Sequence, residues 1–193
     1  QEAHERGKKF FVTSNLIAHN DKVRTYLRDI EPVIALKPDA LIMADPGLIM
    51  QVREKWPEVP IHLSVQANTT NWATVKFWQK LGVARIILSR ELSLDEIEGI
   101  RNECPDMELE VFVHGALCIA YSGRCLLSGY FTGRDSNQGA CTNTCRWKYQ
   151  AHEARETGTG DIVPIRTVNG RATTGDDDDP PVMLLEEETR PGE

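Results

Sequence analysis

The chain has 193 residues, of which 40% are hydrophobic and 26% are charged, a composition typical of a globular protein with its own core. No stretch approaches the roughly 18 apolar residues of a membrane-spanning helix. These values argue against a membrane span and against a disordered chain, and we expect a cytoplasmic protein.

The net charge of −7 comes from one end of the chain. Residues 1–150 carry 18 basic and 18 acidic side chains, whereas residues 151–193 carry 4 basic and 11 acidic ones. Residues 116–150 are locally basic, and aromatic side chains lie between the basic ones. Basic and aromatic residues together suit an anionic partner with stackable rings, such as RNA. A neutral surface over core aromatics would give the same composition, so this interpretation stays open.

A strand-and-helix unit recurs along the first 115 residues. Short apolar runs, each ending on a polar residue, span 9–15, 40–45, 61–66, 85–90 and 109–115, as parallel strands buried on both faces do. The residues between these runs predict helices over 20–37, 46–55, 70–81 and from Ser93 to about Cys104. Ser93 and Glu96 form a capping box at the start of the last helix.

Strand–helix units in series with right-handed crossovers predict a parallel sheet. A doubly wound sheet usually carries a glycine-rich phosphate turn after its first strand, and neither GxGxxG nor GxxxxGK[ST] occurs in the chain. We therefore expect an α/β fold, an incomplete (β/α)8 TIM-like barrel. Only five strands are visible, and the chain opens without Met and ends on TRPGE. We expect a fragment in which the first βα units and a following region are missing.

Four of the five cysteines lie within 28 residues, at positions Cys118, Cys125, Cys141 and Cys145. Clustered cysteines share disulfides or a metal, and disulfides are disfavoured in a cytosolic enzyme. The spacing fits neither the short pairs of zinc ribbons, nor the ferredoxin runs, nor a thioredoxin-type C-x-x-C motif. It favours an iron–sulfur cluster modestly over zinc. We interpret Cys104 as a structural or free thiol.

The sequence divides into three parts on these grounds. Residues 1–115 form the partial β/α barrel, residues 116–150 the cysteine-rich iron–sulfur-binding segment, and residues 151–193 an irregular acidic tail that starts a truncated region. We expect most of the tail to be loop or disorder, with a short strand at Val182–Leu185. The acidic run Asp176–Asp179 is interpreted as a solvated loop.

Polar side chains end all five apolar runs, and catalytic groups of a β/α barrel lie at the carboxyl ends of its strands. The candidate catalytic residues at these ends are Asn15, Asp45, Gln66, Arg90, Glu91 and His114. Structural alternatives exist, because Asp45 suits a helix cap and Arg90 with Glu91 suits a local ion pair. His114, four residues before Cys118, is open to three roles: acid–base catalysis, metal ligation or a buried hydrogen bond.

The stretch FVHGALCIAYSGRCLLSGY, followed by NQGACTNTCRW, resembles the collagenase-like peptidase family of unassigned catalytic type. Its motif is filled here by Glu110, Phe112, Gly115, Cys118, Gly123 and Cys125. The stretches DALIMADPGLIM, HLSVQANTTNWATVKFW and ILSRELSLDEIE are similar to a tRNA-modifying branch of that family. The resemblance runs nearly continuously over residues 1–150 and weakens in the tail.

The resemblance implies an enzyme that converts the wobble uridine of tRNA to 5-hydroxyuridine without molecular oxygen, with prephenate as the hydroxyl source. It also implies a 4Fe–4S cluster on Cys118, Cys125, Cys141 and Cys145. Relatives do similar work on ribosomal RNA and on ubiquinone precursors. The expected partners are tRNA and a small-molecule hydroxyl donor, with no membrane and no DNA. Anion binding by Arg90 or Arg124 and proton transfer by His114 or Glu91 are the roles that we assign.

Two other functions stay open. A peptidase is suggested by the family label alone, because the sequence has no G-x-S-x-G elbow and no H-E-x-x-H helix. A zinc-stabilised, non-catalytic RNA-binding module would keep the thiols and the basic segment without the chemistry. Metal content separates this module from the hydroxylase.

Overall fold

The structure is a computed structural model that describes residues 2–115, 118–159, 161–164, 167–168, 171–172 and 181–189. It divides into two compact units, residues 1–142 and residues 143–193. The first unit contains a five-stranded sheet, and the second contains a three-stranded and a two-stranded sheet. Within the described residues, none of the helices combines the length and apolar character that a membrane span requires.

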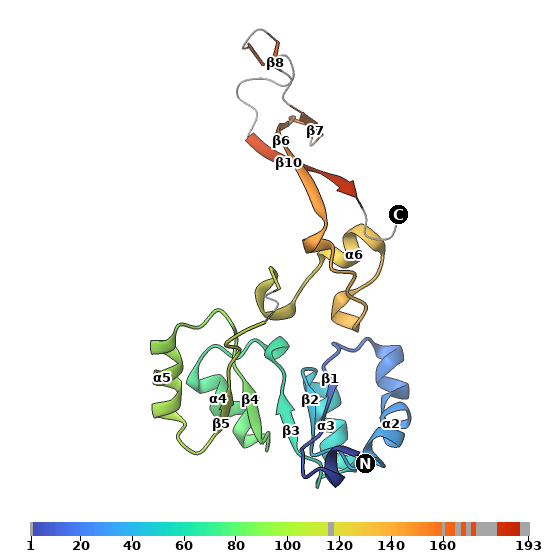
Figure 1. The fold of residues 1–193 in the computed structure, drawn as a ribbon, viewed down its shortest axis with the longest axis vertical. Coiled ribbons are helices and arrows are strands. Elements are labelled where there is room, and N and C mark those ends of the chain that lie inside the picture. The colour runs from blue at the N-terminus through green and yellow to red at the C-terminus, as the bar shows by residue number, and fades with distance from the viewer. Residues whose placement is uncertain are drawn as a thin grey trace. The chain divides into compact units, whose positions relative to one another are not determined.

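The first unit is a parallel sheet whose strands alternate with helices (Figure 1). The strands are β1 (Phe11–Ser14), β2 (Ala40–Met43), β3 (Ile61–Leu63), β4 (Arg85–Ile87) and β5 (Glu108–Glu110), paired in chain order and all parallel. The helices between them are α2 (Asn20–Ile34), α3 (Pro46–Lys55), α4 (Trp72–Lys80) and α5 (Leu94–Glu103), and α1 (Glu2–Glu5) precedes β1. This order confirms the predicted α/β fold and is compatible with part of a barrel.

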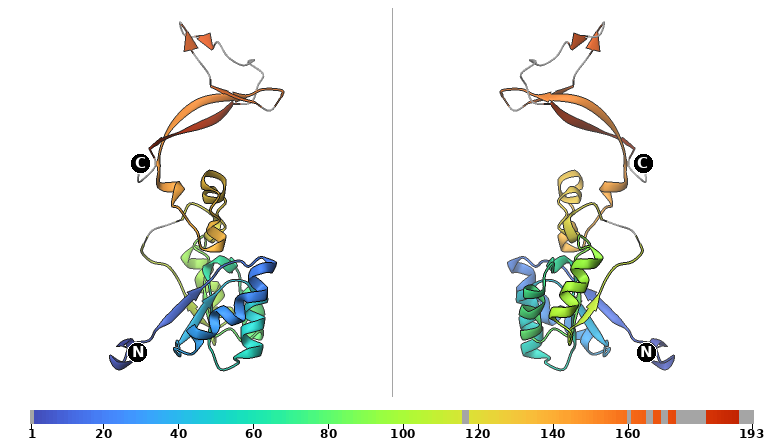
Figure 2. Two further views of the ribbon diagram at one scale, coloured as in Figure 1. Left: turned by 90° about the vertical axis from the view of Figure 1, so that its right-hand side faces the viewer. Right: turned by 90° about the vertical axis from the view of Figure 1, so that its left-hand side faces the viewer.

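One face of this sheet packs against the helices (Figure 2). Leu41, Leu63 and Ile86 are fully buried there, because alternate residues of a strand point to the same face. Each of the four helices adds side chains to this core; they include Tyr26, Ile30, Leu48, Val52, Val75, Trp78 and Ile100. With the helices packed on this apolar face, the carboxyl ends of the strands remain as an edge on which a site can be built.

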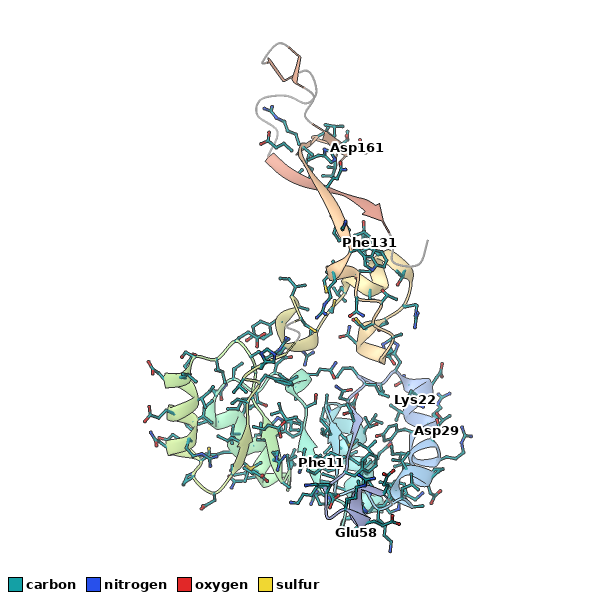
Figure 3. The ribbon with its side chains drawn as sticks, in the orientation of Figure 1. Phe11, Lys22, Asp29, Glu58, Phe131 and Asp161 are labelled. Carbon is teal, nitrogen blue, oxygen red and sulfur yellow. The ribbon has the colours of Figure 1, made fainter. Side chains whose placement is uncertain are left out.

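The other face of the sheet is more polar. The ring of Phe11, labelled in Figure 3, lies 4.9 Å from that of His62, and Arg85 forms an ion pair with Glu110 at 2.9 Å. Burial lowers the pKa of His62, and the nearby charge of Arg85 lowers it further. His62 is therefore neutral near pH 7, between an aromatic ring and an arginine.

Helix bounds follow local signals in the sequence. Helix α3 has the predicted bounds, with Pro46 in its first turn. Helix α5 begins with the predicted capping box between Ser93 and Glu96. Helix α2 ends at Ile34, earlier than the predicted Lys37, which takes a left-handed φ of 54°.

All five strands end earlier than predicted, and the fifth falls short of its predicted end by the most. Strand β5 ends at Glu110, whose carbonyl oxygen accepts from Leu88 at 2.9 Å. Beyond Ile87 the neighbouring chain turns away, and the N–H of Ser89 donates instead to Thr69 at 3.1 Å. Residues 111–113 therefore have no continuing strand beside them on that side, and His114 does not end a strand as predicted.

The second unit corrects the expectation of an irregular tail. Strand β6 (Lys148–Glu156) pairs antiparallel with β10 (Pro181–Thr189) and with β7 (Ile162–Pro164). Strands β8 (Thr167–Val168) and β9 (Arg171–Ala172) form a small hairpin. The predicted strand Val182–Leu185 lies within β10, whereas the acidic run 176–179 lies outside the described residues. The sequence did not predict β6 because its residues are mostly polar and its partner strand is distant in the chain.

Candidate functional site

Residues 118–142 of the first unit, here called the cysteine segment, lie at the carboxyl ends of the strands. Arg90 follows β4 and donates to the carbonyl oxygens of Cys118 and Ala120, each at 3.4 Å. The next residue, Glu91, accepts from the N–H of Ser122 at 2.7 Å and from its hydroxyl. Two consecutive charged side chains thus bind the backbone of the segment just beyond the end of one strand.

The loop after β3 holds the same part of the segment. This loop forms the short helix η1 (Val65–Ala67), and η2 (Tyr121–Gly123) packs against it. Arg124 donates through Nε to the side-chain oxygen of Asn68. Gly123 has a φ of +84°, and a Cβ placed on it would lie 2.8 Å from Cγ of Gln66. Both the backbone conformation and the close approach favour glycine at position 123.

A third set of contacts holds the segment over the loop after β1. The N–H of Ile17 donates to the carbonyl of Asn137 at 2.9 Å, and the Gln138 side chain donates to the carbonyl of Ile17. Ser136 and Asn137 in turn donate to the carbonyl of Cys125 at 2.8 and 2.9 Å. The cysteine segment is therefore fastened above β1 as well as above β3 and β4.

Two of the candidate catalytic residues have structural partners at the other strand ends. Asp45 caps α3 by accepting from the N–H of Leu48 at 3.0 Å, and its second oxygen accepts from the N–H of Ala18 at 3.0 Å. Asn15 donates to the hydroxyl of Ser64 at 3.4 Å. These contacts tie the loops after β1, β2 and β3 together.

The structure brings three candidates together and leaves one apart. Gln66, Arg90 and Glu91 all contact residues of the cysteine segment. His114 is exposed, in the stretch between β5 and the cysteine segment. The contacts around Ser122, which is fully buried with its hydroxyl 3.2 Å from that of Ser89, were not predicted. Ser122 is not among the residues of the family motif, so the motif did not point to these contacts.

Several buried polar atoms around the segment lack a partner among the described residues. They are Oε1 of Gln66, Nδ2 of Asn68, Oγ1 of Thr69 and Nε of Arg90. Three of these residues also contact the cysteine segment through other atoms. Because a buried polar atom without a partner is costly, such a group indicates a place where water or a ligand completes the hydrogen bonds.

The cysteines have the residue type and accessibility of metal ligands but, among the described residues, are not gathered into a metal site. All five are thiols; Cys118, Cys141 and Cys145 are exposed, Cys125 is half-buried and Cys104 is buried in the core. Exposed thiols can become thiolates, the ligands of iron–sulfur clusters and zinc. Across the part of the chain that the structure describes, no three or more His, Cys, Asp or Glu side chains gather closely enough to hold a metal ion. Cys145 moreover belongs to the second unit.

Two pockets meet at Arg124 and Leu126. One, of roughly 380 Å³, is lined mainly by apolar side chains together with Cys125 and Tyr130. The other, of roughly 420 Å³, is lined by polar side chains that include His19, Asp135 and Asn137. Both volumes fall within the range of small-molecule sites. The segment thus forms pockets as well as carrying the thiols.

The fold and this site define an α/β protein with its candidate site at the carboxyl ends of parallel strands. Residues 1–178 match Peptidase family U32, and the chain belongs to this family.

Two similar relatives are both called tRNA hydroxylation protein P. The one from Escherichia coli is 60% identical over 197 residues, which cover 100% of this chain and 44% of the relative. The one from Haemophilus influenzae is 64% identical over 163 residues, covering 84% of this chain and 35% of the relative. The 23S rRNA 5-hydroxycytidine C2501 synthase of Escherichia coli is 40% identical over 147 residues, which cover 76% of this chain and 22% of the relative. The chain thus spans less than half the length of these relatives.

Replacing Gly123 with alanine should destabilise the first unit by more than the cost of placing an alanine at a positive φ, because the new Cβ would also lie too close to Gln66. Gly133 is a matched control, because its φ is +67° but a Cβ there would meet nothing within 4 Å. We expect Gly133→Ala to cost about 1 kcal/mol and Gly123→Ala clearly more, measured as the free energy of unfolding in urea. Equal costs for the two variants would show that Gly123 does not pack closely on Gln66.

Acid should release Glu91 from Ser122. Burial raises the pKa of Glu91, but hydrogen bonds from the side chain and backbone of Ser122 outweigh it and lower the pKa below its ordinary 4.5. A lowered pKa in the folded state means that the stabilisation is present above pH 4.5 and is lost as the pH falls through the lowered value. In an NMR titration, the amide of Ser122 should move with a midpoint below 4.5, and Glu91→Gln should abolish this step. A midpoint at or above 4.5 would contradict the contact.

Proposed function

We propose that this protein is an RNA-modifying enzyme that hydroxylates a uridine of tRNA. The observation that carries the proposal is the attachment of the cysteine segment across the carboxyl ends of the parallel strands, by Arg90, Glu91 and Asn68. Catalytic groups of β/α folds lie at this edge. The attachment therefore brings potential metal ligands and two pockets to the part of the fold best suited to chemistry.

The names of the relatives support RNA as the substrate. Two relatives are called tRNA hydroxylation protein P, and a third is named for making 5-hydroxycytidine in 23S rRNA. Hydroxylation of RNA is the activity that these names share. We take tRNA as the substrate because the relatives named for it are 60 and 64% identical to this chain, against 40% for the rRNA enzyme.

The finer proposal is that the product is 5-hydroxyuridine at the wobble position, made without molecular oxygen. Replacing the hydrogen on C5 by a hydroxyl group removes two electrons from the base, so the donor of the oxygen must be reduced by two electrons. We propose prephenate as this donor. Within the chain, Arg90 and Glu91 hold the segment in place, Arg124 binds an anionic group, and His114 is an accessible group for proton transfer.

We further propose that Cys118, Cys125, Cys141 and Cys145 hold a 4Fe–4S cluster, with zinc as the alternative metal. Four thiolates are the usual ligand set of such a cluster, and all four side chains are at least partly accessible. When bound, the cluster would supply electron transfer or a binding point for the oxygen donor. Cys104 is excluded from the set because it is buried in the core, with its sulfur 3.6 Å from the carbonyl of Trp72.

Peptide hydrolysis, which the family name suggests, has less support. The buried hydroxyl of Ser122 bonds to Glu91 and lies beside Ser89 rather than beside an imidazole. A serine nucleophile needs a base that accepts its proton and an open approach for the substrate, and Ser122 is fully buried.

A strain that lacks this gene and any oxygen-dependent route to the same nucleoside should lose 5-hydroxyuridine and its derivatives from its tRNA. Mass spectrometry of digested tRNA measures this loss, and the intact gene should restore the nucleosides. Unchanged nucleosides in the deleted strain would overturn the proposed activity. Cleavage of gelatin by the purified intact protein would instead favour a peptidase.

Alanine at each of the four proposed ligands should abolish cluster binding, whereas Cys104→Ala should not. The intact protein, purified without oxygen, should be brown and contain about four iron and four sulfide per chain. Iron, sulfide and zinc analysis of the five variants measures the effect. Equal iron in all five variants would show that the ligand assignment is wrong, and one zinc without iron would favour the RNA-binding module.

A further inference from the structure

The two pockets that share Arg124 differ in chemical character. The first has apolar walls, and three of the side chains around it are unusually exposed: Ile119 at 77%, Leu126 at 79% and Tyr130 at 83%. Large apolar side chains gathered on a surface around one hollow are typical of a binding site. The pocket also reaches Cys125, one of the proposed metal ligands.

The second pocket carries the groups that suit an anion. Arg124 uses its Nε to donate to the side-chain oxygen of Asn68, which restrains the guanidinium, and its side chain lines both pockets. His19 is exposed beside it at the start of α2 and makes no side-chain cap bond. Asp135 is the acidic residue among the lining side chains, and its carboxylate already accepts from the N–H of Asn137 at 2.8 Å.

We propose that these two pockets together bind one nucleotide of the RNA substrate. The base lies in the apolar pocket against the ring of Tyr130, and its phosphate lies in the polar pocket near Arg124 and His19. An aromatic ring and a fixed guanidinium are the groups with which proteins hold single-stranded nucleotides. This inference rests on the proposed function, because it names where the RNA binds.

The arrangement specifies a nucleotide rather than a purely apolar ligand. A purely apolar ligand would fill the first pocket but would not use the positive charge of Arg124, which lines both pockets. A nucleotide joins a flat, stackable ring to an anionic group through a short linker, as the two pockets join at Arg124 and Leu126. The base would then lie next to Cys125, close to where the proposed chemistry takes place.

Binding of a fluorescently labelled oligouridylate to the intact protein tests the proposal. Tyr130→Ala should weaken binding about 10-fold through lost stacking, whereas Tyr130→Phe should keep the affinity because the ring remains. Arg124→Gln should weaken binding and reduce the slope of log K against log salt by about 0.7, as expected for one lost phosphate contact on a single strand. Circular dichroism checks that each variant folds.

Two matched variants serve as controls. Phe77 is an exposed ring on α4 (54% exposed), and Arg134 is an exposed arginine in the cysteine segment that lines neither pocket. Phe77→Ala and Arg134→Gln should leave affinity and salt slope unchanged. If they weaken binding as much as the Tyr130 and Arg124 variants do, or if none of the variants matters, the nucleotide site is overturned.

Measuring tRNA hydroxylation in the same variants separates this inference from the proposed function. If the wild type hydroxylates tRNA and both the Tyr130→Ala and Arg124→Gln variants do so at the same rate, the pocket assignment is overturned and the proposed function stands. Binding that depends on Tyr130 and Arg124, in a wild type that modifies no tRNA, would support the pocket and overturn the activity.

Discussion

The attachment of the cysteine segment to Arg90 and Glu91 is the interaction on which the candidate site depends. Both residues lie in the loop that follows β4, which ends at Ile87, so the sheet determines where this loop begins. Their partners are backbone atoms of Cys118, Ala120 and Ser122. Ser122 takes a φ of 36°, which a residue with a side chain adopts only when its surroundings hold it there. Glu91 provides this restraint by accepting from both the N–H and the hydroxyl.

The position of Ser122 determines where the next two residues of the chain lie. Gly123 packs against Gln66, and Arg124 reaches Asn68, so the residues from 122 to 124 contact the loops after both β4 and β3. Arg124 in turn lines both pockets, together with Leu126. Residues 122–124 thereby connect the loops of the parallel sheet to the surface on which a nucleotide would bind.

The sequence predicted local features better than distant ones. Helix α3 and the capping box of Ser93 and Glu96 depend on neighbours within one turn, and the structure confirms both. The length of β5 and the existence of β6 depend on strands far away in the chain, and both predictions were wrong. At the site, polar residues after the strands were recognisable, but most of their partners are backbone carbonyl and amide groups, which have no signature in the sequence. The catalytic roles of these residues stay predictions.

At two of the cysteines the backbone is held by hydrogen bonds, whereas the thiol is accessible. The carbonyl of Cys118 accepts from Arg90 and that of Cys125 from Ser136 and Asn137, so the main chain at both positions is restrained. The thiols of the same residues are exposed or half-buried. A bound metal would restrain these side chains, and its binding energy would add to the stability of a segment that the sheet has already positioned. Metal binding and attachment of the segment should therefore reinforce each other. Each process restricts the conformations of the segment, so the second to occur has less conformational entropy to lose.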